Sequence, residues 1–284
     1  MNYNIFTGIL KMFSSFMESS DGVTLTCDNS NDKFTVLRDK YYLQEIAGNG
    51  DELSKTLNIL FWLSDSVFHF GGAGECATFN SLDLLSYSYK KGANFGINCR
   101  GLATILTECL LSLGIAARTL YIHPFSPYDE DNHVVTLAFI KTLNKWIMLD
   151  PSYNSYVTDT KNNILDVFEI RHRLAEQKPI RFNKEANHNG EKLSEDSPFY
   201  TEYLAKDLFY FETPECSKFG CDDDENNRII TICPKNFDVK TRNIYNVEYR
   251  IKKYGDSKNM NEWLKNTKEN WVLYCSVDEF LKVM

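Results

Sequence analysis

Hydrophobic residues recur along the chain with two different periods, which predict helices in some segments and strands in others. Spacings of three and four residues, typical of a helix with one buried face, occur within residues 5–17, 51–68, 80–90, 99–113 and 165–176. Runs of β-branched and aromatic residues at 119–122, 134–140 and 146–149 predict strands. A short polar stretch joins the last two runs, so we expect them to form an antiparallel hairpin.

Shorter patterns extend the prediction to the rest of the chain. Apolar runs predict strands at 23–27, 34–37, 228–233, 244–251 and 271–274. We expect helices at 261–266 and near residue 280, and residues 200–210 fit a helix or a helix followed by a strand. Residues 178–197 are polar and lack periodicity, which indicates a linker or a long surface loop.

The helix that starts near Cys99 has clear signals at both ends. Asn98 is a good N-cap residue, and Gly114 stands where a left-handed residue commonly ends a helix. Cys99 therefore lies in the first turn, where unpaired N–H groups and the helix dipole stabilise a thiolate. The same N–H groups could hold an oxyanion. Free cysteine is more often a small buried residue, so Cys99 alone does not identify an active site.

His133 and Asp150 lie at the two outer ends of the predicted hairpin. Because the start of one antiparallel strand lies beside the end of the next, the two residues are expected at the same end of the sheet. A carboxylate there would fix the imidazole tautomer and leave the second ring nitrogen for a thiol. A histidine at a strand start and an Asp before Pro151 are each common turn residues. Their occurrence after Cys99, in the order helix, strand, strand, is what indicates a Cys-His-Asp triad.

Other polar residues are weaker candidates for the same roles. His69 precedes Cys99, and His123 lies in a loop before Pro124. Neither has an Asp at a matching strand end, so both rank below His133 as the base. Asn80 and Asn98 are candidates for a second oxyanion donor.

Composition narrows the classes of function. Of the 284 residues, 43% are hydrophobic, which is enough to fill a folded core. The net charge of −8 and the lack of a basic run argue against a nucleic-acid partner. The sequence has no apolar stretch of membrane-spanning length, and its first helix lacks the features of a secretory signal.

The eight cysteines show no spacing typical of a zinc site, and we expect neither a metal nor a cofactor. Scattered thiols fit a reducing compartment, which favours a cytoplasmic protein. Cys216, Cys221 and Cys233 lie around the acidic run 222–225. We expect a solvated loop there, with a metal cluster as the alternative.

The chain resembles the transglutaminase-like superfamily over about residues 51–175, and most specifically over 98–153. Asn98 and Arg100 stand where an aromatic residue often flanks the cysteine in this family. The motifs that carry the resemblance are Cys99 at a helix start, Gly-Ile-Ala-Ala-Arg at 114–118, His133 at a strand start and the stretch from Trp146 to Pro151.

The resemblance implies an α+β fold with a papain-like core, in which the helix carrying Cys99 packs on an antiparallel sheet. It also implies that Cys99 is the nucleophile, His133 the base and Asp150 the residue that orients the base. The predicted organisation is an N-terminal helix with short strands at 1–50, a transglutaminase-like catalytic core at 51–178, a polar linker or loop at 179–199, and a C-terminal α/β extension or small subdomain at 200–284.

The function predicted from this resemblance is cysteine-dependent acyl transfer, with hydrolysis of an amide bond in a peptide or protein through a thioester. A transglutaminase that cross-links proteins would use the same triad. We favour hydrolysis because no aromatic tunnel beside Cys99 is evident that would protect a thioester from water. A non-catalytic binding module on the same fold is a third possibility, and the oligomeric state stays open.

Overall fold

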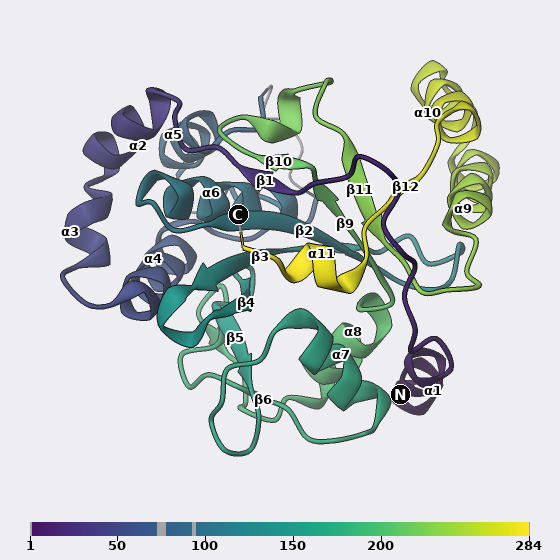
Figure 1. The fold of residues 1–284 in the computed structure, drawn as a ribbon. Coiled ribbons are helices and arrows are strands. Elements are labelled where there is room, and N and C mark those ends of the chain that lie inside the picture. The colour runs from purple at the N-terminus through teal and green to yellow at the C-terminus, as the bar shows by residue number, and fades with distance from the viewer. Residues whose placement is uncertain (1, 73–77, 93–94, 284) are drawn as a thin grey trace.

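The computed structural model describes residues 2–72, 78–92 and 95–283. Within these ranges, eleven α-helices surround an eight-stranded mixed sheet (Figure 1). This arrangement agrees with the predicted α+β class. Cys76 lies outside the described residues.

The main sheet is antiparallel except at one edge, where β11 and β12 run parallel. The predicted hairpin is confirmed as β3 and β4, which pair at the centre of the sheet beside β2. In spatial order the strands are β12 (Leu273–Tyr274), β11 (Ile229–Ile232), β9 (Tyr210–Pro214), β2 (Ala117–His123), β3 (His133–Ile140), β4 (Lys145–Asp150), β5 (Ser155–Thr158) and β6 (Arg181–Phe182). Two smaller sheets pair β1 (Thr26–Cys27) with β10 (Cys216–Ser217) and β7 (Asn187–His188) with β8 (Glu191–Lys192).

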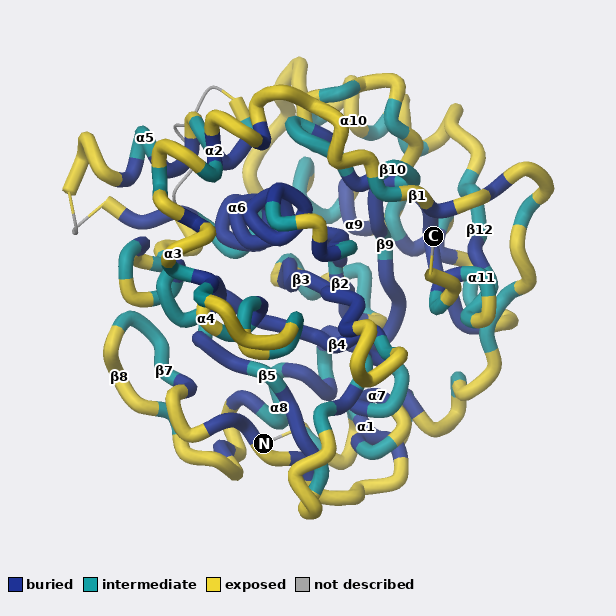
Figure 2. Tube along the Cα trace, turned by 60° about the vertical axis from the view of Figure 1, so that its left-hand side comes forward, coloured by how far each residue is buried: buried dark blue, intermediate teal, exposed yellow. Residues whose placement is uncertain are grey.

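One face of the sheet is covered by α6 (Cys99–Ser112), which is buried along most of its length (Figure 2). The predicted helix is thus confirmed, and Gly114 adopts the expected positive φ of 77° after its end. Apolar side chains of α6, of the sheet and of the surrounding helices form one core. Those helices are α2 (Lys33–Tyr41), α3 (Leu43–Ala47), α4 (Glu52–Ser66) and α5 (Ser81–Lys91).

The other face of the sheet carries a second core that is rich in aromatic side chains. Alternate residues of β3 point into the two cores, as the pleat requires: Leu137 belongs to one and Ala138 to the other. α1 packs against α7 and α8, so the first helix docks on the body of the protein. The helices on this side are α1 (Tyr3–Met12), α7 (Val167–Ala175), α8 (Pro198–Asp207) and α11 (Val277–Leu281).

The remaining helices lie beside one end of the sheet. α9 (Val239–Tyr254) and α10 (Lys258–Glu269) pack against each other near β11 (Figure 1). Two short 3₁₀ turns occur at Lys141–Leu143, between β3 and β4, and at Cys221–Asp223, after β10.

Two predicted strands are wrong. Residues 34–37 belong to α2 and residues 244–251 belong to α9. Both segments place apolar residues three apart, such as Phe34 and Leu37, and these become the buried side of a helix. The first helix is also shorter than predicted, because it ends at Met12 and Phe16 instead bridges to Pro234.

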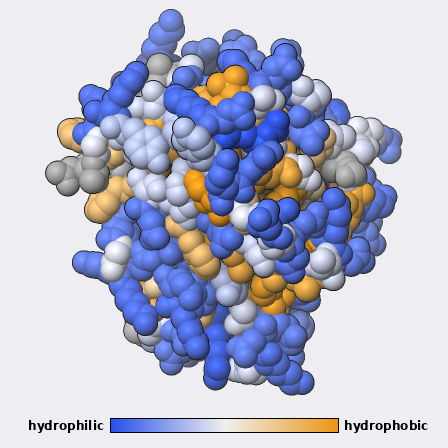
Figure 3. Space-filling view, turned by 90° about the vertical axis from the view of Figure 1, so that its left-hand side faces the viewer, coloured by the Kyte–Doolittle hydropathy of each residue, from blue (hydrophilic) through white to orange (hydrophobic). Residues whose placement is uncertain are grey.

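The surface that carries α2, α3 and α4 is mainly hydrophilic, with apolar side chains in small groups (Figure 3). Across the described ranges, the structure contains no helix with the length and apolar character needed to cross a bilayer.

Candidate active site

Cys99 begins α6, and its thiol is half-buried. The side chain of Asn98 caps the helix, because its Oδ1 accepts a hydrogen bond from the N–H of Gly101 at 2.9 Å. Burial raises the pKa of the Cys99 thiol, but interactions with the imidazoles of His133 and His69 outweigh it and lower the pKa to about 6. The thiol is therefore largely a thiolate near neutral pH.

His133 and Asp150 form a buried pair in which His133 Nε2 lies 2.6 Å from Asp150 Oδ2. The hairpin register explains the contact: Thr136 pairs with Leu149, so Asp150 stands beside residue 135, two positions from His133 on the same face. Burial lowers the pKa of His133, yet the charge and hydrogen bond of Asp150 raise it well above its usual value. Since Asp150 occupies Nε2, Nδ1 is the nitrogen left for the thiol.

Two further groups hold the Asp150 carboxylate. The Tyr200 hydroxyl donates to Oδ2 at 2.5 Å, and the N–H of Ser152 donates to Oδ1 at 2.8 Å. Burial raises the pKa of Asp150, but His133 and these two donors keep it below its usual value. Tyr200 lies on α8, fifty residues from Asp150, and the sequence contains no local signal for this contact.

The other two candidate bases lie in different places. His123 Nε2 pairs with Glu212 Oε2 at 2.9 Å and its ring stacks on Tyr210, in the wall of a 410 Å³ cavity beside α9 and α10. His69, ranked low from the sequence, instead contacts the site through the Cys99 thiol. Its backbone bridges to that of Ile97, two residues before the thiol.

The two asparagines proposed as oxyanion donors act as N-caps. Asn98 caps α6 as described above, and Asn80 Oδ1 accepts the N–H of Asp83 at 3.1 Å to cap α5. Asn80 Nδ2 also donates to the Asp83 carboxylate at 2.8 Å. Both contacts of Asn80 are thus with the first turn of its own helix.

A further histidine, His188, reaches the site from the segment predicted as a linker or loop. Residues 178–197 contribute the edge strand β6 and the β7–β8 hairpin. His188 lies on this hairpin, and its Nε2 is 3.0 Å from His69 Nδ1. The Asn189-Gly190 pair at its tip is a strong hairpin signal that would have predicted the turn, although not its position beside Cys99.

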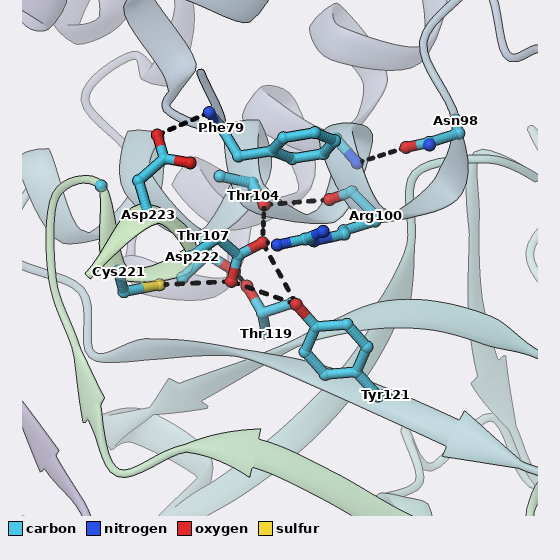
Figure 4. Close-up of polar contacts among 12 residues, drawn as sticks. Phe79, Asn98, Arg100, Thr104, Thr107, Thr119, Tyr121, Cys221, Asp222 and Asp223 are labelled. Atoms are coloured by element: carbon cyan, nitrogen blue, oxygen red, sulfur yellow. Dashed lines mark hydrogen bonds and ion pairs between the residues drawn. The ribbon is translucent and has the colours of Figure 1, made fainter. Parts of the chain in front are cut away.

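The first turn of α6 is tied to the C-terminal third of the chain (Figure 4). Arg100 Nε donates to Asp222 Oδ2 at 2.9 Å, and the Tyr121 hydroxyl donates to the same carboxylate at 3.1 Å. The Asp222 side chain is 2% exposed, so the predicted solvated loop is wrong at this residue. Its carboxylate anchors the loop on the helix that carries the thiol.

The described residues contain no group of three or more His, Cys, Asp or Glu side chains arranged to hold a metal ion. The seven cysteines within the described ranges are all free thiols. What this site offers chemically is a nucleophile, an acid-base pair and a set of hydrogen-bond donors.

Comparison with known proteins gives partial structural matches. No family model and no curated protein matches the sequence. A candidate cysteine protease from Cytophaga hutchinsonii is similar over 47% of this chain and 45% of its own, with 22% identity and a TM-score of 0.33. A candidate protease from Parabacteroides distasonis is similar over 57% of this chain and 30% of its own, with 10% identity and a TM-score of 0.28. The chain thus spans less than half the length of either match, and likenesses this partial assign no function.

Proposed function

We propose that this chain is a cysteine-dependent acyl-transfer enzyme of transglutaminase-like type, with Cys99, His133 and Asp150 as its catalytic triad on a papain-like core at residues 51–178. One observation carries the proposal. A half-buried thiol with its pKa lowered to about 6 lies at a helix N-terminus beside a buried histidine–carboxylate pair. Such a thiol is nucleophilic near pH 7.

The reaction proceeds in two halves. The Cys99 thiolate attacks the carbonyl carbon of an amide, the Sγ–C bond forms and the carbonyl π electrons move to oxygen. Protonated His133 gives its Nδ1 proton to the leaving amine as the C–N bond breaks, which leaves a thioester. Neutral His133 then takes a proton from water, whose oxygen attacks the thioester and releases the acid and the thiolate.

Asp150 keeps His133 in the required tautomer and stabilises its charged form. The proposed substrate is a peptide or protein, because its amide carbonyls suit this chemistry. A lysine amine in place of water would give a cross-link through the same residues, so the acceptor has to be measured.

Acylation by p-nitrophenyl acetate tests the proposal without knowledge of the natural substrate. We expect a burst of p-nitrophenolate equal to the enzyme concentration and an acetyl group on Cys99, located by peptide mass spectrometry. Cys99→Ala should abolish the burst. Cys27→Ala is the matched control, since Cys27 is also half-buried but burial raises its pKa.

A second measurement identifies the acceptor. Addition of methylamine should leave acetate as the main product if water is the preferred acceptor, whereas N-methylacetamide would indicate a transamidating enzyme. If wild type shows no burst and Cys99 reacts no faster than a model thiol, the chain is a binding module and the enzymatic proposal is wrong.

A further inference from the structure

The segment around His69 runs directly beside the residues that precede the nucleophile. Phe70 donates its N–H to Ile97 O at 3.0 Å, and Ile97 donates its N–H to Phe68 O at 2.8 Å. The chains approach so closely at Gly96 that a Cβ there would lie 2.6 Å from Phe68 O. His69 is therefore held at a fixed position relative to the start of α6.

The tip of the β7–β8 hairpin is hydrogen-bonded to the backbone of His69. Asn189 Oδ1 accepts the backbone N–H of His69 at 2.8 Å, and Asn189 Nδ2 donates to the backbone carbonyl of His69 at 2.9 Å. Asn189 and Gly190 have φ values of 52° and 86°, as a tight two-residue hairpin turn requires. Both backbone polar groups of His69 are thus satisfied by one side chain.

His188 contacts the ring of His69: His188 Nε2 lies 3.0 Å from His69 Nδ1. Its own ring packs on Tyr153, with centroids 5.2 Å apart. Burial and the nearby His69 lower the pKa of His188, against opposing effects of Asp150 and Glu191. His188 is therefore neutral at pH 7 and carries a single ring proton.

The tautomers of the two rings follow from the charge of Cys99. A thiolate repels a bare nitrogen lone pair and attracts an N–H, which assigns a hydrogen to His69 Nε2, the ring nitrogen that His188 does not contact. The same reasoning assigns His188 Nε2–H as the donor to His69 Nδ1. Within the described chain, His69 Nε2 is buried and no group is placed to pair with it in full hydrogen-bond geometry. This N–H is an oriented donor beside the reacting sulfur.

We propose that His69 is the second oxyanion donor of the site, an imidazole whose Nε2–H binds the carbonyl oxygen when Cys99 attacks, and that His188 and Asn189 are the positioning residues that fix its ring and its backbone. The inference rests on the proposed acyl-transfer function. As the Sγ–C bond forms, negative charge moves from sulfur to the carbonyl oxygen. The Nε2–H of His69 then donates its hydrogen bond to that oxygen. His69 transfers no proton in this step and leaves acid-base chemistry to His133.

Two reagents separate this role from simple stabilisation of the thiolate. Acylation by p-nitrophenyl acetate passes through an oxyanion, whereas alkylation by iodoacetamide does not. Both rates are measured at a pH of about 9, where the Cys99 thiol is ionised even if its pKa rises by about two units. Alkylation at the native rate also reports that a variant is folded around Cys99.

His69→Ala should slow acylation by about 10²-fold, the usual loss for one oxyanion donor, and change alkylation less than about twofold. His69→Gln keeps an N–H donor and should restore acylation to within about tenfold of wild type. His172→Gln, at an exposed position on α7, is the matched control and should change neither rate.

The same pair of reagents tests His188 as a positioning residue. His188→Ala should slow acylation while alkylation stays unchanged, and His188→Gln, which keeps a donor for His69 Nδ1, should rescue it. If wild type forms acyl-Cys99 and His69→Ala is acylated at the same rate, His69 is not the oxyanion donor. The same holds if His69→Ala slows acylation and alkylation by the same factor. A wild type that forms no acyl-Cys99 would instead overturn the proposed function, and the role of His69 with it.

Discussion

Asp150 is the most constrained side chain at the site. It is fully buried, and it accepts hydrogen bonds from His133, Tyr200 and Ser152. A buried carboxylate is stable only when its charge is compensated in this way. The arrangement fixes His133 Nε2 as a donor and leaves Nδ1 for the thiol.

Asp150→Asn tests this orienting role. The amide replaces a charged acceptor and favours the wrong imidazole tautomer, so we expect acylation of Cys99 to fall by about 10³- to 10⁴-fold. Tyr200→Phe is the comparison, because it removes one donor and leaves the carboxylate; we expect a loss of about tenfold or less. Burst kinetics measure both, and equal losses in the two variants would contradict the orienting role.

The sequence could predict the three proposed catalytic residues because each lies at the end of an element with a strong local signal. Asn98 and the apolar period define the start of α6, and the hairpin brings His133 and Asp150 to one end of the sheet. It could not predict Tyr200 or His188, since both reach the site from segments that are distant along the chain. Tertiary packing alone determines those contacts.

At the scale of elements, the approach between the His69 segment and the start of α6 depends on Gly96. A Cβ at this residue would meet backbone atoms at 2.6 and 2.7 Å, which a side-chain rotation cannot relieve. Gly96→Ala should therefore displace the His69 segment. We expect it to lower the rate of Cys99 acylation, as His69→Ala does. Gly8→Ala, in open space on α1, is the control. Native acylation by Gly96→Ala would show that the close approach has no role in the reaction.

The buried carboxylate of Asp222 joins the C-terminal third of the chain to α6. Asp222→Asn removes the charge that pairs with Arg100 and weakens the hydrogen bond from Tyr121. We expect a loss of about 1–3 kcal/mol in the free energy of unfolding, measured by urea denaturation. The lower part of that range is expected because the Arg100 side chain is 39% exposed. Asp196→Asn, at an exposed position, should change the free energy of unfolding little. A loss of equal size in Asp196→Asn would show that the loss at Asp222 does not come from its buried contacts.

The sequence predicted best the helices whose apolar residues keep a clear helical period over several turns. α4, α5, α6 and α7 were found because apolar residues keep the helical period through each of them. The predicted strand at 244–251 failed because Ile244, Val247 and Ile251 fit a helical period as well as a β-branched run. Its N-cap, Asp238, lies outside the apolar run and accepts the N–H of Thr241 at 3.0 Å. In such segments tertiary contacts decide between the two structures.

At the scale of the whole molecule, Glu108 links three parts of the chain. It lies on α6 and accepts hydrogen bonds from the N–H and hydroxyl of Ser81, at 2.8 and 2.6 Å, and from the N–H of Gly220 at 2.8 Å. Burial nevertheless raises the pKa of Glu108 from 4.5 to about 7. The folded protein therefore binds more protons than the unfolded chain between these two pH values.

This difference predicts how stability depends on pH. The contribution of Glu108 is fully present below the unfolded pKa of 4.5 and is lost as pH rises toward 7, by about 3 kcal/mol in total. Glu108→Gln should reduce the dependence of the free energy of unfolding on pH by this amount, measured by urea denaturation across that range. Glu225→Gln, at an exposed site, should keep it. A slope of unchanged size in Glu108→Gln would contradict the assignment to Glu108.

The state of the Cys99 sulfur is the most direct test of the whole account. The rate of iodoacetamide alkylation, read at Cys99 by peptide mass spectrometry, is measured against pH in wild type and in His133→Ala. We predict a wild-type midpoint of about 6 and an upward shift of about one to two units in His133→Ala, because the imidazole that stabilises the thiolate is gone. A wild-type midpoint at the ordinary value of 9.0, or one that His133→Ala leaves unchanged, would contradict the proposed active site.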